Sequence, residues 1–225
     1  MEDITNMNFE LGTKNPTLMD KPFWKYMISS RPEESIFDVL SKTGVGTKGK
    51  VVYCFCRHGI AGAYLPDGRM IYTGGQHDTD DKLPENYPLE KRPPLETATF
   101  LGSKNMNDIT IYGYPENVFP KNSFHTACHV RSADGKDYVY IIGGTICEEG
   151  EITQVYRLSV SDFSIERVEM SGDGPKCCVT LCTSKGLTKN GRTVVQMSVT
   201  HRCKLPQEIL VYELDIETNV WTVLE

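Results

Sequence analysis

The sequence predicts an all-β protein made of repeated antiparallel units, preceded by a short helical segment at the N-terminus. Two observations carry this prediction. From Lys50 onward, short runs rich in β-branched and aromatic residues alternate with turn residues, which is typical of successive antiparallel strands. In addition, a stretch of the C-terminal half repeats without gaps at the end of the chain. Together they favour a sandwich, a barrel or a propeller.

Length and composition fit one soluble globular domain. The chain has 225 residues, of which 39% are hydrophobic and 24% charged. A chain of this length buries a sizeable core without disulfide or metal staples. The net charge of −6 argues against a direct nucleic-acid binder, because such proteins carry a basic stripe that follows the phosphates.

Targeting signals also bear on the location of the protein. Residues 1–16 are polar and acidic and lack the apolar stretch of a secretory signal. The longest apolar runs, such as Tyr138–Ile142, are too short to span a bilayer. We therefore expect a cytoplasmic protein without a direct membrane contact.

Eight cysteines occur in the chain, at positions 54, 56, 128, 147, 177, 178, 182 and 203. The reducing cytosol disfavours disulfides, and the CxxC pairs of zinc sites are absent. Cys54 and Cys56 would share one face of a strand, which is a weak metal geometry. We predict that most of these cysteines are buried structural thiols, and we predict no cofactor and no bound metal.

The N-terminal region, residues 1–49, is predicted to be a tail followed by a helical extension. Residues 18–29 have apolar side chains at helical spacing. Residues 30–43 are predicted as a second helix, because Ser30 and Glu33 have the spacing of a capping box and Gly44 follows the apolar face.

Strands are predicted through residues 50–225. The first run is 51–56, and a hairpin of 61–65 and 69–73 ends at Gly74–Gly75. A long polar loop, 76–96, follows. Further strands are predicted at 97–101, 107–114, 124–130, 138–142, 154–160, 165–170, 179–183, 193–200, 208–216 and 220–224.

An internal repeat decides among the all-β architectures. Residues 155–169 align without gaps on residues 211–225, at an offset of 56, and both read as strand, acidic turn, strand. Residues 69–75 resemble residues 138–144 at an offset of 69, and both end in a double glycine. Removing a loop insertion of about 15–20 residues reduces the second offset to about 50, the length of one propeller blade.

These residues resemble the Kelch repeat. The best match is residues 123–170, with Ser-Phe-His-Thr-Ala at its start and Ile-Ile-Gly-Gly at 141–144. The last copy supplies Val-Tyr-Glu-Leu-Asp at 211–215 and Trp221, but has Met-Ser-Val at 197–199 in place of the double glycine. Residues 65–69, 111–115 and 118–120 are similar to segments of poorly characterised bacterial Kelch-like proteins. The resemblance covers about 50–225 and implies four-stranded blades, but no particular activity.

The blade count is lower than a closed ring requires. Residues 57–115, 121–170 and 176–225 form three units, whereas closed propellers have at least four blades. Three alternatives remain. Residues 18–56 contribute a degenerate fourth blade, or helix 30–43 covers an edge of an open ring, or two chains pair through open edges to form a homo- or hetero-oligomer.

The first functional hypothesis is a non-catalytic scaffold that binds a partner protein through propeller loops. Its surface is acidic, so the expected partner has a basic patch. The predicted binding residues are Arg57, His77, Asp78, Asp80, Asp81, Glu148 and Glu149.

Two other hypotheses remain open. Phe23, Trp24 and Tyr26 form an aromatic cluster that is suited either to docking the chain into a larger assembly or to capping an open propeller edge within the same chain. A metal-dependent enzyme or small-molecule binder would instead use His77, His125 and His129. No catalytic residue is predicted, because the G-x-S-x-G, H-E-x-x-H and phosphate-loop patterns are absent from the sequence.

Overall fold

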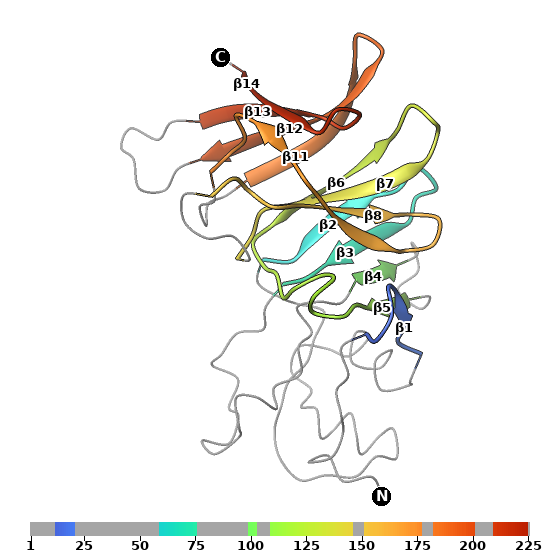
Figure 1. Ribbon diagram of the computed structural model, residues 1–225. Coiled ribbons are helices and arrows are strands. Elements are labelled where there is room, and N and C mark those ends of the chain that lie inside the picture. Colours follow the sequence, from blue (N-terminus) through green and yellow to red (C-terminus); the bar gives the residue numbers. More distant parts are fainter. Residues whose placement is uncertain are drawn as a thin grey trace, which may run out of the picture.

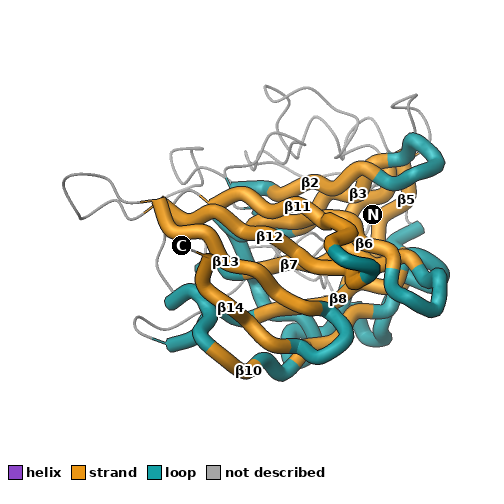
Figure 2. The backbone as a smooth tube through the Cα atoms, turned by 90° about the horizontal axis from the view of Figure 1, so that it is seen from above, coloured by secondary structure: helices purple, strands orange, loops and turns teal. Residues whose placement is uncertain are grey.

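The computed structural model describes residues 12–20, 59–75, 99–102, 109–145, 151–176, 182–200 and 209–224. Every regular element in these ranges is a strand, so the all-β prediction is confirmed for them (Figure 2). None of the described residues belongs to a helix that is long and apolar enough to cross a membrane.

The predicted helix 18–29 does not begin at Leu18. This residue ends strand β1, Thr17–Leu18, and pairs with Tyr112, so its backbone groups bond to a neighbouring strand rather than to a helical turn. Residues 21–29 and the predicted helix 30–43 lie outside the described residues.

The strands form three antiparallel meanders, which we call sheets 1, 2 and 3 in chain order (Figure 1). Sheet 1 contains β2 (Ala61–Tyr64), β3 (Met70–Thr73), β4 (Thr99–Gly102) and β5 (Ile109–Gly113), with β1 on β5. Sheet 2 contains β6 (Thr126–Arg131), β7 (Asp137–Ile142), β8 (Val155–Ser159) and β9 (Ile165–Val168). Sheet 3 contains β11 (Cys182–Lys189), β12 (Arg192–Thr200), β13 (Ile209–Asp215) and β14 (Val220–Leu224), with β10 (Ser171–Gly172) parallel to β14.

In each meander the first strand, β2, β6 or β11, lies beside the first strand of a neighbouring sheet, and we call it the inner strand. The inner strand β6 of sheet 2 lies beside both β2 and β11, so the three sheets stack in chain order with sheet 2 in the middle (Figure 1). Each meander falls within one of the three repeat units expected from the sequence.

Strand β7 of sheet 2 is buried on both faces over its last four residues. In β7, Val139 and Ile141 pack in the core shared with sheet 1, while Tyr140 and Ile142 pack in the core shared with sheet 3. All four side chains are fully buried. Side chains alternate between the two faces of a strand, so one apolar run serves two cores.

The 56-residue repeat reappears in the packing. Five residues of sheet 2 that face sheet 1 have counterparts 56 positions later in sheet 3 that face sheet 2. The first set is Val139, Ile141, Tyr156, Leu158 and Ile165; the second is Val195, Met197, Tyr212, Leu214 and Trp221.

The turns that join the last two strands of sheets 2 and 3 are also equivalent. Phe163 and Asn219, again 56 positions apart, both have a left-handed backbone, with φ of 59° and 58°. Their amides donate to the carbonyl oxygens of Ser159 and Asp215, each at 2.9 Å. The gapless alignment in the sequence therefore corresponds to a repeated hairpin.

Replacing Leu158 or Leu214 with Ala tests this equivalence. Both leucines are fully buried at corresponding positions, so we expect each change to lower the free energy of unfolding by about 3 kcal/mol in urea titrations. The exposed Thr222→Ala control should change it by less than about 0.5 kcal/mol. A loss below about 1 kcal/mol at either leucine would contradict close packing between its two sheets.

Candidate functional site

The predicted binding residues Arg57, His77, Asp78, Asp80, Asp81, Glu148 and Glu149 lie outside the described residues, as do Phe23, Trp24 and Tyr26. The structure nevertheless describes the points at which their segments join the sheets. Arg57 is two residues before Gly59, His77 is two residues after Gly75, and Glu148 is three residues after Thr145.

Two of these points are hydrogen-bonded to one short segment, Asn122–Phe124, which leads into β6 and which we call the hub. The amide of Phe124 donates to the carbonyl oxygen of Gly59 at 2.8 Å. The amide of Gly75 donates to the carbonyl oxygen of Asn122 at 2.9 Å. The hub thus holds both ends of the β2–β3 hairpin.

The third point, Thr145, is bound to the hub as well. Its amide donates to the carbonyl oxygen of Ser123 and to Oδ1 of Asn122, both at 3.0 Å. The buried Asn122 amide also donates from Nδ2 to the carbonyl oxygen of Gly143 at 2.9 Å. All three segments that carry the predicted binding residues therefore start from the same end of sheets 1 and 2.

The double glycines allow this close approach. Gly74 and Gly144 have φ of 60° and 99°, a conformation that L side chains rarely adopt. A Cβ on Gly74 would overlap the Asn122 carbonyl oxygen, and one on Gly144 would overlap Asn122 Oδ1. One glycine of each double-glycine pair is thus required for the close approach to Asn122.

His125 fixes the hub to sheet 1. Its Nε2 lies 2.7 Å from Oγ1 of Thr73 at the end of β3, and both residues are buried. Burial lowers the pKa of His125 to about 4, and the hydrogen bond to Thr73 only partly opposes this effect. His125 is therefore a neutral interior residue at pH 7.

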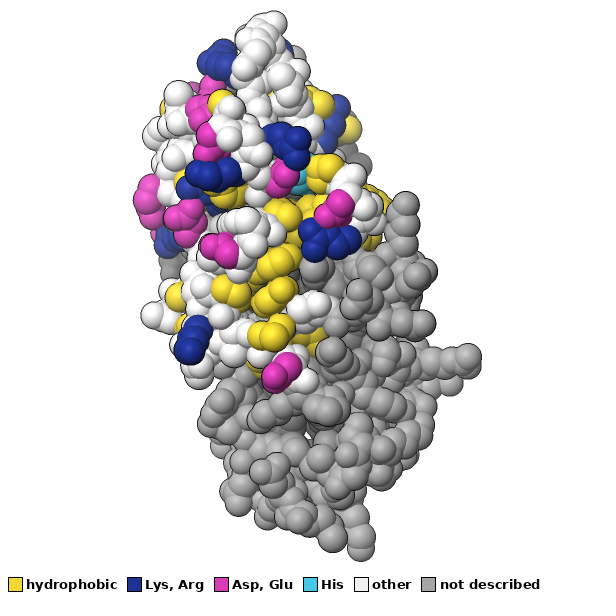
Figure 3. Space-filling view, turned by 90° about the vertical axis from the view of Figure 1, so that its right-hand side faces the viewer, with side chains coloured by type: hydrophobic (Ala, Val, Ile, Leu, Met, Phe, Trp, Pro, Cys, Tyr) yellow, Lys and Arg dark blue, Asp and Glu magenta, His cyan; other side chains and the backbone are white. Residues whose placement is uncertain are grey.

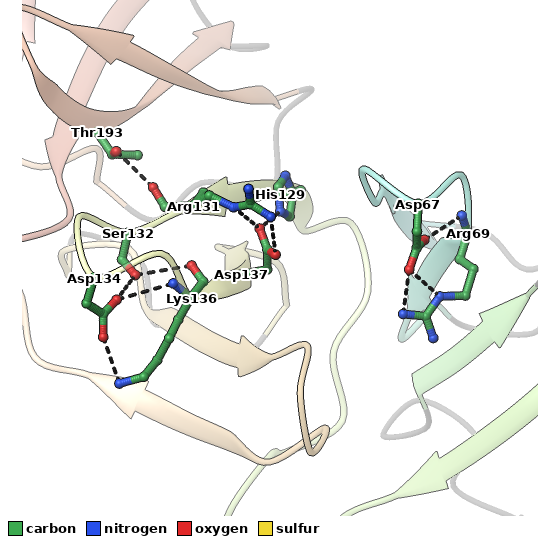
Figure 4. A network of polar contacts seen from close by, with 9 residues as sticks. All are labelled: Asp67, Arg69, His129, Arg131, Ser132, Asp134, Lys136, Asp137 and Thr193. Carbon is green, nitrogen blue, oxygen red and sulfur yellow. Dashed lines mark hydrogen bonds and ion pairs between the residues drawn. The ribbon is translucent and has the colours of Figure 1, made fainter.

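His129 lies at the other end of β6, in a different environment. Its Nε2 is 2.7 Å from Oδ1 of Asp137, and Arg131 binds the same carboxylate at 3.0 and 2.7 Å (Figure 4). The hydrogen bond from Arg131 is the main cause that lowers the pKa of Asp137, and His129 adds to it. Four residues of extended chain separate His125 from His129 by about 13 Å, so the structure does not bring them together.

Sequence reasoning missed a pair of matching charged turns near His129. Asp67 accepts from the Arg69 side chain at 2.7 Å, and Asp134 pairs with the Lys136 ammonium at 2.7 Å (Figure 4). The shared Asp-Gly-basic pattern was the signal that could have revealed them. Acidic and basic side chains are interspersed on the face seen in Figure 3, with hydrophobic ones between them.

Two cysteines are described, and both are free thiols. Cys128 is buried in the core between sheets 2 and 3, and burial raises its pKa to about 11. Such a thiol is unreactive at neutral pH. The prediction of a buried structural thiol is therefore confirmed for Cys128. The described residues contain no cluster of three or more His, Cys, Asp or Glu side chains that could hold a metal ion.

Comparisons with known proteins give no family assignment. No family model matches this chain, and a search of curated proteins gives no match. The Kelch resemblance therefore depends on the residues quoted for it above.

Replacing Gly144 with Ala tests the hub. A side chain there has an unfavourable backbone conformation and also meets the Asn122 amide. Gly135→Ala is the matched control, because Gly135 has a similar φ of 83° but no neighbour within 4 Å. In urea unfolding we expect Gly144→Ala to cost at least about 2 kcal/mol more than Gly135→Ala. Equal losses in the free energy of unfolding for the two variants would contradict the close contact between residue 144 and Asn122.

The buried His125 predicts a loss of stability in acid. Its pKa is about 4 in the folded protein and near the ordinary 6.5 in the unfolded chain, so the unfolded chain takes up a proton first as pH falls. This contribution is complete above pH 6.5 and is lost between pH 6.5 and 4, by about 3 kcal/mol in total. Urea unfolding across this range should show a smaller loss in His125→Gln. An unchanged pH dependence in that variant would overturn the assignment.

Proposed function

We propose that this chain is a non-catalytic protein-interaction module, and that its three sheets are the blades of an incomplete Kelch-like propeller. The observation that supports the binding function best is the hub. It hydrogen-bonds Gly59, Gly75 and Thr145, the three points from which the predicted binding segments leave the sheets.

The propeller interpretation draws on three features. Each sheet is a meander whose first strand is innermost, as in a blade. Equivalent positions 56 residues apart face the preceding sheet in sheets 2 and 3. The buried Trp221 fills the space between these two sheets, where it makes an edge contact with Tyr212 at 6.4 Å between ring centroids.

The proposed partner is a protein with a basic patch, met in the cytoplasm. The three segments that leave the hub contribute five carboxylates, one arginine and one histidine to the predicted surface. These residues follow or precede the hub-bound points by two to six positions in the sequence, which supports the proposal that their charges gather near that end of the stack. A rigid scaffold that presents loops of one net charge gives a steered and salt-sensitive interaction.

Neutralising the acidic loop tests the proposal. In quantitative affinity purification, we expect the triple variant Asp78→Asn, Asp80→Asn and Asp81→Asn to retain at least tenfold less of a partner protein than the wild-type chain retains. This partner should also dissociate when the salt concentration is raised from about 0.05 M to about 0.5 M, because salt screens the attraction between exposed charges.

The matched control neutralises three acids outside the hub, with Asp67→Asn, Asp134→Asn and Glu217→Gln. These residues lie in exposed turns. The control should retain the partner. Identical sets of bound proteins for wild type and the acidic-loop variant would refute the proposed surface.

A further inference from the structure

The two outermost sheets of the stack end in chemically different faces. In sheet 2, Tyr140 and Ile142 are fully buried against sheet 3. The residues 56 positions later are Gln196 and Ser198, which are only partly buried. They lie on the face of sheet 3 that points away from sheet 2, which we call its far face.

The neighbours of Gln196 form a polar row across the middle of this far face. The cross-strand row through it contains Lys185, Gln196, Glu213 and Thr222. Glu213 accepts from the Lys189 ammonium at 3.1 Å. The rows on either side are mixed, with Leu187, Val194 and Val220 on one side and Val211 and Leu224 on the other. A polar outer face is the mark of a repeat that ends a stack.

The far face of sheet 1 is apolar instead. Met70 and Tyr72 stand 69 positions before Val139 and Ile141, which pack on the preceding sheet. Ile111 lies on the same side as Tyr72, because both are in register with residue 100. Ile111 is fully buried although sheet 2 lies on the opposite side, so this face needs a cover.

The length and position of one segment identify this cover. Residues 21–58 leave from the outer edge of sheet 1, where the Met19 amide donates to the Ile111 carbonyl oxygen at 2.9 Å, and rejoin at Gly59, just before β2 at the opposite edge. The other connections from an outer strand to the next inner strand take 12 residues (114–125) and 13 residues (169–181).

Counted in the same way, the connection from β1 to β2 is residues 19–60, which number 42 and exceed the shorter of these connections by 30 residues. The four strands of sheet 2 occupy 43 residues, 126–168. The excess is enough for a pair of strands or a helix, but not for a fourth complete sheet. The segment is also rich in apolar residues, including Phe23, Trp24 and Tyr26 and the run 51–56.

We infer that residues 21–58 pack on the far face of sheet 1 as an incomplete fourth layer of the same chain. The aromatic cluster Phe23, Trp24 and Tyr26 then covers Met70, Tyr72 and their neighbours and is not a docking site for another protein. This inference is independent of partner binding at the hub, since either can fail while the other holds.

A photo-crosslinking residue tests the inference directly. With p-benzoylphenylalanine in place of Met70, we expect crosslinks within one chain to peptides from residues 21–58, identified by mass spectrometry of the full-length protein. The same residue in place of Gln196 is the matched control and should give no crosslink to 21–58. A crosslinked dimer from the Met70 position, or crosslinks only to other parts of the chain, would overturn the inference.

Limited trypsin digestion gives a second measurement. Residues 21–58 contain five lysines and arginines that trypsin can cleave after, at 25, 42, 48, 50 and 57, because those at 21 and 31 precede proline. We expect Tyr72→Asp to raise cleavage within 21–58 at least tenfold, while Gln196→Asp leaves it unchanged. Equal cleavage rates in the two variants would contradict a cover on sheet 1. The crosslinking result stands by itself if Tyr72→Asp fails to fold.

Discussion

Strand β7 of the middle sheet has no face for solvent along Val139–Ile142, and the rest of the structure depends on this constraint. Val139 and Ile141 fill one core, while Tyr140 and Ile142 fill the other. A strand with one polar face finds its register by keeping that face in water, but β7 is apolar on both sides and lacks this guide. Its register must come from the segments at its two ends.

Different contacts fix the two ends of β7. Before β7, the Ser132–Lys136 turn closes with Ser132 donating to the Lys136 carbonyl oxygen at 2.9 Å, and Asp134 pairs with Lys136. After β7, Asn122 binds the carbonyl oxygen of Gly143 and the amide of Thr145. The hub therefore helps to set the register of the central strand and also binds the residue at which the next loop begins. Stability and the proposed binding surface depend on the same buried amide.

Much of the fold could be predicted from residues close together in the sequence, whereas contacts between residues far apart in the sequence could not. The hairpin predicted at 61–65 and 69–73 is observed as Ala61–Tyr64 and Met70–Thr73, because Pro-Asp-Gly specifies a tight turn. The hub escaped prediction because Asn122 bonds to groups more than 20 residues away in sequence. The partner of His129 is nearer in the sequence, because Asp137 lies across the β6–β7 hairpin. Predicting this contact still requires the register of the two strands.

The unequal outer faces also explain why an open stack suits this sequence. A ring closed by direct contact between sheets 1 and 3 would press the apolar face around Tyr72 against Gln196, Ser198 and Glu213. Such burial would desolvate the Lys189–Glu213 ion pair and leave the Gln196 amide to find new partners, both unfavourable unless well compensated. Sheet 3 keeps its polar row at the surface, whereas the apolar face of sheet 1 requires a cover. In the proposed arrangement, three sheets and a partial layer would cover this apolar face without ring closure.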